Sequence, residues 1–223
     1  MEPLFAASIA KVQRAKSFIA ELATEQQRYA ATSVRTRVVI QDGQPQFHVD
    51  WEGTGLLPGI ILGDTIHNLR SALDIMATDL ALIAGQNPDE AYFPFAADLE
   101  SLRRSKKFKK FAKIGVDFAE LLETIAPYRG GNKAMRALHD LDVQDKHKGL
   151  IATVKDIDFC FDGEIDLDDP TSHSLTGKAE VVEYKFPDGS PLAGEPIIKT
   201  LELLAKTVEG LLEEFAALVA TRR

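Results

Sequence analysis

The chain of 223 residues is 45% hydrophobic, which is enough apolar material for one large domain with a buried core. Its formal net charge of −8 excludes a general affinity for nucleic acid, because phosphate binding is driven by basic surface. The single cysteine, Cys160, excludes an internal disulfide framework and is typical of a reducing compartment, so we expect a cytoplasmic protein.

The apolar segments are too short or too interrupted for membrane insertion. Lys11, Arg14 and Lys16 break up the first apolar stretch, so no signal-peptide core forms there. The longest uncharged apolar run, 53–63, falls well below the ~20 residues that span a bilayer. We therefore expect a single soluble domain over 1–223 with no membrane partner.

A helix predicted over 3–32 is followed by the clearest local pattern in the sequence, a β-hairpin over 34–51. The hairpin turns at Asp42-Gly43, a dipeptide preferred in type I′ turns. Pairing about this turn gives one mainly apolar face and sets Arg35 opposite Asp50 on the other. The pairs on the apolar face are Val38 with Phe47, Thr36 with Val49 and Val34 with Trp51.

The middle of the chain is predicted to be helical, and glycine and proline residues mark where the helices end. The expected helices are 60–84, 98–114, 116–125 and 132–145, within a helical core over 60–148. Pro58-Gly59 is expected to break the chain before the first of them, and Gly130-Gly131 separates the last two.

The helix expected over 98–114 concentrates positive charge. Residues 101–115 contain seven basic side chains and no acid, which leaves 19 basic against 34 acidic residues elsewhere. The seven are Arg103, Arg104, Lys106, Lys107, Lys109, Lys110 and Lys113. Two interpretations stay open: a solvated face whose lysine stems cover apolar surface, or a surface that contacts phosphate. In the second case Lys107 and Lys110 are candidate binding residues.

After Leu150 the period of the pattern changes to two, which predicts strands in a small β segment over 150–187. The last helix, 195–221, has a heptad seam that can pack within the bundle or against a second copy, as a homodimer through this helix. The seam residues are Ile197, Leu201, Leu204, Val208, Leu211, Phe215 and Leu218. We expect an α+β fold, mainly α: a bundle of about five helices with an inserted β-hairpin and a small antiparallel sheet.

The helix expected over 60–84 has an apolar side and a polar side. At about 100° per residue, its polar residues fall within a sector of about 120°. They are Asp64, His67, Arg70, Ser71, Asp74 and Thr78. A histidine beside an arginine supplies a proton-transfer group and a fixed cation. The alternative is a solvated face on which Arg70 and Asp74 form an i,i+4 ion pair.

A second polar cluster closes the helix expected over 132–145, and with the first it allows two classes of site. Its members are His139, Asp142, Asp145, Lys146 and His147. One class is a metal site in which His67, His139 and His147 bind a transition metal together with a carboxylate. No recognised ligand spacing supports it, so we assign no metal ligand and expect no cofactor. The other is a metal-free phosphodiester site, where histidine transfers protons and arginine neutralises phosphate.

The run 63–74, GDxxHNLRSALD, resembles the signature of an uncharacterised group of bacterial and phage proteins. That group also has segments like Phe93-Pro94, Pro127-Tyr128 and Asp145-Lys146-His147-Lys148. The order and spacing agree over about residues 60–150.

The Arg-Ser-Ala-Leu-Asp part of this run is in turn similar to the arginine, four-to-six residues, histidine motif of HEPN domains. These are helical bundles, often dimeric, and many are ribonucleases of toxin–antitoxin and phage-defence systems. The similarity implies that Arg70 binds phosphate, but Ile75 occupies the position of the motif histidine. Either His67 or His147 substitutes for it, or the site only binds, as HEPN domains without the motif are thought to do.

Three functions are therefore expected from the sequence. The first is a HEPN-like protein that binds, and less readily cleaves, RNA or nucleotides. Its catalytic candidates are His67, Arg70 and His147, and its binding candidates are Asp64, Asn68, Ser71, Asp74, His139, Asp145, Lys146, Lys107 and Lys110. The second is a non-enzymatic protein-interaction module of a prophage or defence operon. The third is a metal-binding helical-bundle enzyme.

Overall fold

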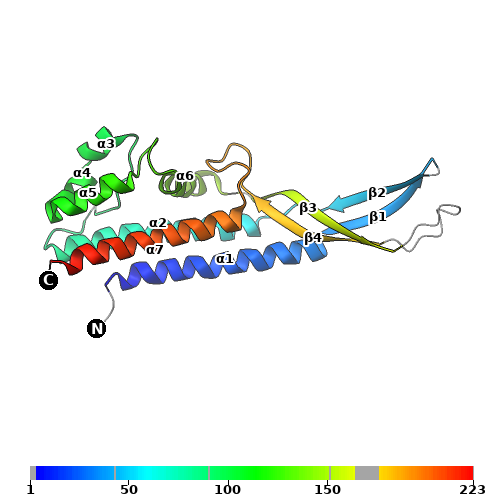
Figure 1. Cartoon of the computed structure of the whole chain (residues 1–223), viewed down its shortest axis with the longest axis horizontal. Helices are drawn as coiled ribbons and strands as arrows, with labels where there is room; N and C mark the ends of the chain where they lie inside the picture. Colours follow the sequence, from blue (N-terminus) through cyan, green and yellow to red (C-terminus); the bar gives the residue numbers. More distant parts are fainter. Residues whose placement is uncertain (1–3, 43, 90, 151, 164–175, 223) are drawn as a thin grey trace.

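The computed structural model describes residues 4–42, 44–89, 91–150, 152–163 and 176–222, and the molecule is elongated (Figure 1). A helical body fills one end, and two β-hairpins extend from it as an arm. The α+β, mainly helical fold predicted from the sequence is confirmed. The described ranges hold seven helices rather than about five. None of these helices combines the length and the apolarity needed to cross a bilayer.

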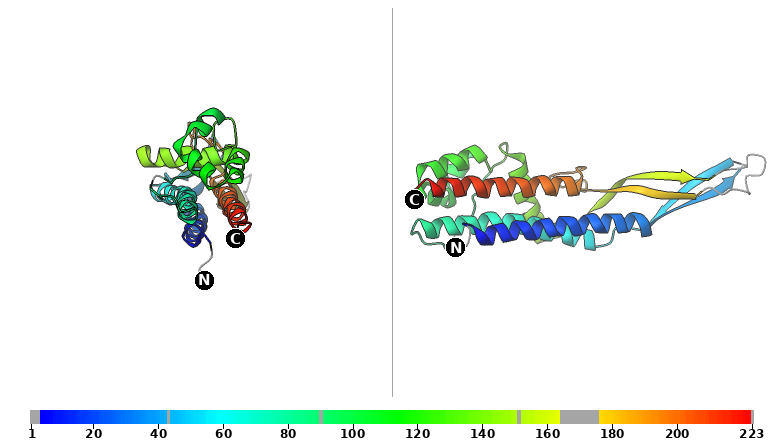
Figure 2. Two further views of the ribbon diagram at one scale, coloured as in Figure 1. Left: turned by 90° about the vertical axis from the view of Figure 1, so that its left-hand side faces the viewer. Right: turned by 60° about the horizontal axis from the view of Figure 1, so that its bottom comes forward.

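The helices of the body form two layers. Three long helices lie side by side, and the four shorter ones cover one side of them (Figure 2). The long helices are α1 (Ala6–Thr32), α2 (Leu57–Ile83) and α7 (Ile197–Ala220). The short helices are α3 (Leu99–Arg104), α4 (Lys106–Ile114), α5 (Val116–Ile125) and α6 (Lys133–Lys148).

α2 is the central helix, because other helices pack on it from several sides. Its apolar residues Leu62, Ile66, Leu69, Leu73, Met76 and Leu80 are fully buried. The predicted start at residue 60 is wrong, since the helix begins at Leu57 with Pro58 in its first turn. Proline is tolerated there because the first N–H groups of a helix have no partner within it.

The basic segment does not form the single helix predicted over 98–114. It breaks at Ser105, whose ψ of 143° is extended. The Ser105 hydroxyl accepts a hydrogen bond from the backbone N–H of Phe108 at 3.1 Å, which caps α4. Asp98 caps α3 in the same way through the N–H of Ser101 at 2.7 Å. Two capping residues seven positions apart therefore make two short helices.

The first hairpin of the arm consists of β1 (Val34–Gln41) and β2 (Gln44–Trp51), and all of its predicted pairs are confirmed. Asp42 has a φ of 54°, as a type I′ turn requires, while Gly43 lies outside the described residues. The charged face differs in detail. Arg37, rather than Arg35, forms the ion pair with Asp50, diagonally across the strands at 3.0 Å.

The second hairpin consists of β3 (Thr153–Asp162) and β4 (Thr176–Lys185), which pair antiparallel as predicted. Two register shifts interrupt the pairing. Residues 166–177 are rich in acidic residues, which predicts a loop, but most of them lie outside the described ranges. The two hairpins form separate two-stranded sheets.

The heptad seam of the last helix packs inside the chain. Six of its seven residues are buried, and the seventh, Leu218, is half-buried. Phe215 lies at the centre, where its ring contacts the rings of Phe93, Phe111 and Phe118 at centroid distances of 5.8–6.5 Å. The intramolecular interpretation of the seam therefore holds in this structure.

Gly63 of α2 lies against the Asp145 side chain of α6, and this predicts a stability difference between two helical glycines. A Cβ at Gly63 would overlap the carboxylate of Asp145, whereas a Cβ at Gly210 in α7 would meet nothing within 4 Å. We expect Gly63→Ala to lower the free energy of unfolding by about 1 kcal/mol, because the half-buried Asp145 carboxylate must move aside. Gly210→Ala should raise it by about 0.5–1 kcal/mol. Urea denaturation measures both, and equal effects of the two substitutions would contradict the assignment.

Candidate functional site

The two polar clusters predicted from the sequence meet along one seam between α2 and α6. His67 on α2 contacts Asp142 on α6. One turn further along, Arg70 and His139 both contact the ring of Phe95, which lies in the connection between α2 and α3. The seam thus brings together His67, Arg70 and His139, but it separates them into an exposed part and a buried part.

Arg70 lies in the buried part, and its interactions are structural. Its side chain is 8% exposed and forms an ion pair with Asp74 at 2.5 Å. The guanidinium also lies 4.6 Å from the centre of the Phe95 ring. Asp74 in turn accepts a hydrogen bond from the N–H of Phe93 at 2.9 Å. The expected i,i+4 ion pair is therefore present, and this burial weighs against Arg70 as a phosphate ligand.

His139 is held as a neutral side chain beside Arg70. Its ring stacks on Phe95 with a centroid distance of 4.6 Å and an interplanar angle of 10°. Burial, followed by the nearby charges of Arg70 and Arg136, lowers the pKa of His139 from 6.5 to about 4. Its buried Nδ1 finds no hydrogen-bond partner in the part of the chain that the structure describes. His139 therefore carries no charge at neutral pH.

The exposed part of the seam is a chain of polar contacts built on Asp142. The Asp142 side chain is 5% exposed and binds two groups, His67 through Nδ1 at 3.2 Å and Lys146 through Nζ at 2.6 Å. The His67 side chain is 51% exposed, and its Nε2 lies 3.4 Å from Oγ of Ser71. A buried carboxylate thus orients a histidine that solvent can reach.

Three further predicted residues surround this cluster. Asp145 lies against Gly63, and burial together with the charges of Asp142 and Asp64 raises the pKa of its carboxyl group. Asn68 is buried and donates a hydrogen bond to the carbonyl of Asp64 at 2.7 Å. In the described ranges no three His, Cys, Asp or Glu side chains gather as metal ligands. The described residues therefore give no support to the hypothesis of a metal-binding enzyme.

His147 does not join the seam. Five residues after Asp142, it lies about 140° further round the helix at 100° per residue, so it faces another side of α6. It is exposed and makes no hydrogen bond or ion pair within the described residues. The expectation that His147 supplies the missing motif histidine gains no support from this position.

The seven basic residues of α3 and α4 divide into paired and unpaired ones. Arg103 and Arg104 form ion pairs with Glu123 and Glu100. The two lysines predicted to bind, Lys107 and Lys110, belong to α4, and their side chains contact the connection before α3. Lys107 is 5.2 Å from the centre of the Tyr92 ring, and Lys110 donates to the Asp89 carbonyl. These contacts leave the other three lysines to solvent.

The remaining three, Lys106, Lys109 and Lys113, are exposed and form what we call the lysine row. Their spacing of three and four residues puts them on one side of α4, opposite the buried Phe108 and Phe111. Within the described ranges none of the three makes an ion pair. The binding candidates predicted from the sequence were instead Lys107 and Lys110, although the spacing of the row is visible in the sequence.

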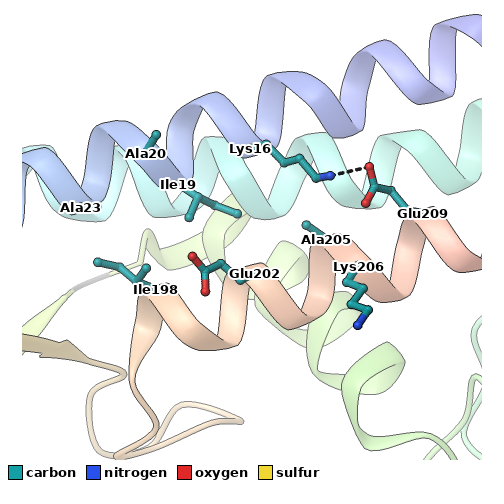
Figure 3. Close-up of a pocket in the computed structure, with 9 residues that line it drawn as sticks. All are labelled: Lys16, Ile19, Ala20, Ala23, Ile198, Glu202, Ala205, Lys206 and Glu209. Atoms are coloured by element: carbon teal, nitrogen blue, oxygen red, sulfur yellow. Dashed lines mark hydrogen bonds and ion pairs between the residues drawn. The ribbon is translucent and has the colours of Figure 1, made fainter.

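A groove that was not predicted from the sequence runs between α1 and α7 (Figure 3). Its volume is 540 Å³ and its lining is mainly small and apolar: Ile19, Ala20, Ala23, Ile198 and Ala205. Lys16 of α1 and Glu209 of α7 form an ion pair across it at 2.5 Å. The groove contains none of the predicted site residues.

Comparison with known proteins found no matching family model, no matching curated protein and no matching solved structure. The function must therefore be inferred from the geometry of the chain itself.

Arg70 is expected to matter for stability more than for activity. Arg70→Ala leaves Asp74 without its cation and should lower the free energy of unfolding by about 2–4 kcal/mol. Arg104→Ala is the matched control, because Arg104 forms the same i,i+4 pair with Glu100 but on the surface. Thermal denaturation of both variants measures this. Equal melting temperatures would show that Arg70 is not a structural anchor.

His139 is expected to make stability depend on pH. Its folded-state pKa lies below its ordinary value, so the unfolded chain binds the proton first as the pH falls. Its contribution is full above pH 6.5 and is lost towards pH 4. His139→Phe keeps the stacking on Phe95 and should remove about 1–3 kcal/mol of this acid-induced loss. Urea titrations at pH 7 and pH 4.5 measure it, with the exposed His147→Gln as control; an unchanged pH dependence in His139→Phe would contradict it.

Proposed function

We propose that the protein binds RNA through the lysine row of α4. The observation that supports this most directly is the placement of three exposed, unpaired lysines on one helix of an otherwise acidic chain. At 1.5 Å per residue the row spans about 10 Å, which matches about three phosphates at 3.4 Å per nucleotide. A row of this length suits a phosphate backbone better than a single phosphate group.

The charge of the remaining chain keeps this contact local. Outside 101–115 acidic residues outnumber basic ones by 34 to 19, so most of the surface repels a polyanion. A small basic surface in a negative field orients the ligand as well as attracting it. The affinity should therefore be modest, salt-dependent and sensitive to a few lysines.

The similarity to HEPN domains supports RNA as the polyanion, and it also supports binding without efficient cleavage. Ile75 stands at the position of the motif histidine, Arg70 is buried in an ion pair, and His147 faces away from the seam. Of the proton-transfer candidates, His67 alone is both positioned by a carboxylate and open to solvent. Cleavage, where it occurs, would depend on His67.

A protein-interaction module is the second candidate, and exposed apolar side chains favour it. Trp51, Leu56 and Ile60 are 62%, 83% and 58% exposed where the arm joins the body. Contiguous exposed apolar residues are typical of interaction surfaces. Since the heptad seam of α7 is used within the chain, a homodimer would have to form through a surface of this kind.

The lysine row gives a direct test of RNA binding. We expect the triple variant Lys106→Gln, Lys109→Gln and Lys113→Gln to raise the Kd for RNA at least about tenfold. It should also flatten the slope of log K against log salt by about 2, at about 0.7 per lost contact with a single strand. Fluorescence anisotropy with a labelled hairpin that carries a single-stranded tail measures both, and the same RNA run on a denaturing gel reports cleavage.

The control variant removes the same number of charges elsewhere. It combines Lys11→Gln, Lys199→Gln and Lys206→Gln, which lie on α1 and α7. If the lysine row binds RNA, this control variant should change the Kd for RNA little, although its net charge equals that of the other triple variant. No binding by the wild-type protein at low salt, or equal weakening by both triple variants, would refute the proposal.

A further inference from the structure

Ser71, His67 and Asp142 are connected in series. The Asp142 carboxylate meets Nδ1 of His67 at 3.2 Å, and Nε2 of the same ring meets Oγ of Ser71 at 3.4 Å. With the Nδ1 proton directed at the carboxylate, Nε2 is the free acceptor and the Ser71 hydroxyl donates to it. This order of acid, imidazole and hydroxyl is the one that activates a serine nucleophile. The long second contact is usual for such groups without a bound substrate.

Ser71 differs from other hydroxyl residues in the helices of this chain. Several of those side chains donate to the backbone carbonyl four residues earlier, as Ser17, Thr65 and Thr78 do at 2.8–3.1 Å. Such a bond is the ordinary choice for a helical hydroxyl. The Ser71 hydroxyl is instead directed at an imidazole whose other nitrogen is held by a nearly buried carboxylate. Packing between α2 and α6 therefore supplies a proton acceptor at this one hydroxyl.

We infer that Ser71 is an activated nucleophile that accepts the acyl group of small, activated carboxylic esters. His67 acts as its general base, and Asp142 is a positioning residue that holds the imidazole. The exposed His67 side chain places the site at the surface, which suits a small ester rather than a ligand enclosed in a pocket. This inference rests on α2 and α6 alone and is independent of RNA binding at α4.

The chemistry balances with water as the second reactant. The Ser71 oxygen bonds to the ester carbonyl carbon while its proton passes to Nε2 of His67. The bond to the alcohol breaks, and the leaving oxygen takes that proton. Water then attacks the acyl-Ser71 ester, gives a proton to His67, and releases the acid as Ser71 regains its hydrogen. No oxidant, metal or cofactor is required.

Acylation is expected to be faster than turnover. Ser71 lies in the middle of α2, where backbone N–H groups are used by the helix, so they do not form an oxyanion hole. The cation of the cluster is Lys146, which is 51% exposed and already bonded to Asp142. Both steps lack oxyanion stabilisation, but an activated ester has a good leaving group and acyl-Ser71 does not, so the acyl-Ser71 ester should accumulate.

Covalent labelling tests the inference. We expect an alkyl fluorophosphonate to modify the wild-type protein at Ser71, and p-nitrophenyl acetate to release a burst of p-nitrophenolate. Ser71→Ala should abolish both signals, while Ser17→Ala, which removes an ordinary helical hydroxyl, should change neither. Peptide mass spectrometry locates the adduct. His67→Gln should slow labelling by about 10²-fold or more.

The role of Asp142 is tested through the pH profile. Labelling of the wild-type protein should accelerate as the pH rises, because only a neutral imidazole can accept the Ser71 proton, and Asp142→Asn should slow it and blunt this rise. Because Asp142→Asn also releases Lys146, circular dichroism verifies its fold, and the half-exposed His67→Gln provides a second variant. No adduct at Ser71, or labelling of His67→Gln at the wild-type rate, would overturn the inference.

Discussion

The ion pair between Arg70 and Asp74 is the interaction on which the helical body depends. A guanidinium that is 8% exposed needs a counter-charge, since a buried unpaired charge costs several kcal/mol. Asp74 supplies the charge and also binds the N–H of Phe93. Phe93 then contacts the rings of Phe111 on α4 and Phe215 on α7. One polar pair thus ties the connection after α2 to two other helices.

This constraint separates residues that the sequence places together. Arg70 and Asp74 are used to build the core, and His139 is kept neutral against Phe95. One turn earlier on the same helix, His67 reaches solvent and is oriented by Asp142 from α6. Of the polar side chains of α2, His67 and Ser71 are therefore available for chemistry, whereas Arg70 is buried in its ion pair.

The two proposed activities use different physical means on different helices. The lysine row of α4 supplies positive charge but no defined pocket, and its affinity for a polyanion depends on the salt concentration. The seam of α2 and α6 offers geometry, with a carboxylate, an imidazole and a hydroxyl in series. The β arm takes part in neither, and the exposed apolar residues at its base belong to neither site.

The sequence by itself determined what depends on local interactions. The register of the first hairpin, the helical body and the two β segments follow from turn residues and from periods of two and 3.6. It did not determine which side of a helix is covered. Periodicity puts Arg70 and His67 on one polar face, but packing of the connection after α2 buries the first and leaves the second exposed. The same connection also contacts the side chains of Lys107 and Lys110. The lysines left exposed and unpaired are therefore those of the lysine row. Burial and pairing are decided by segments distant in sequence, and these meet only in the tertiary structure.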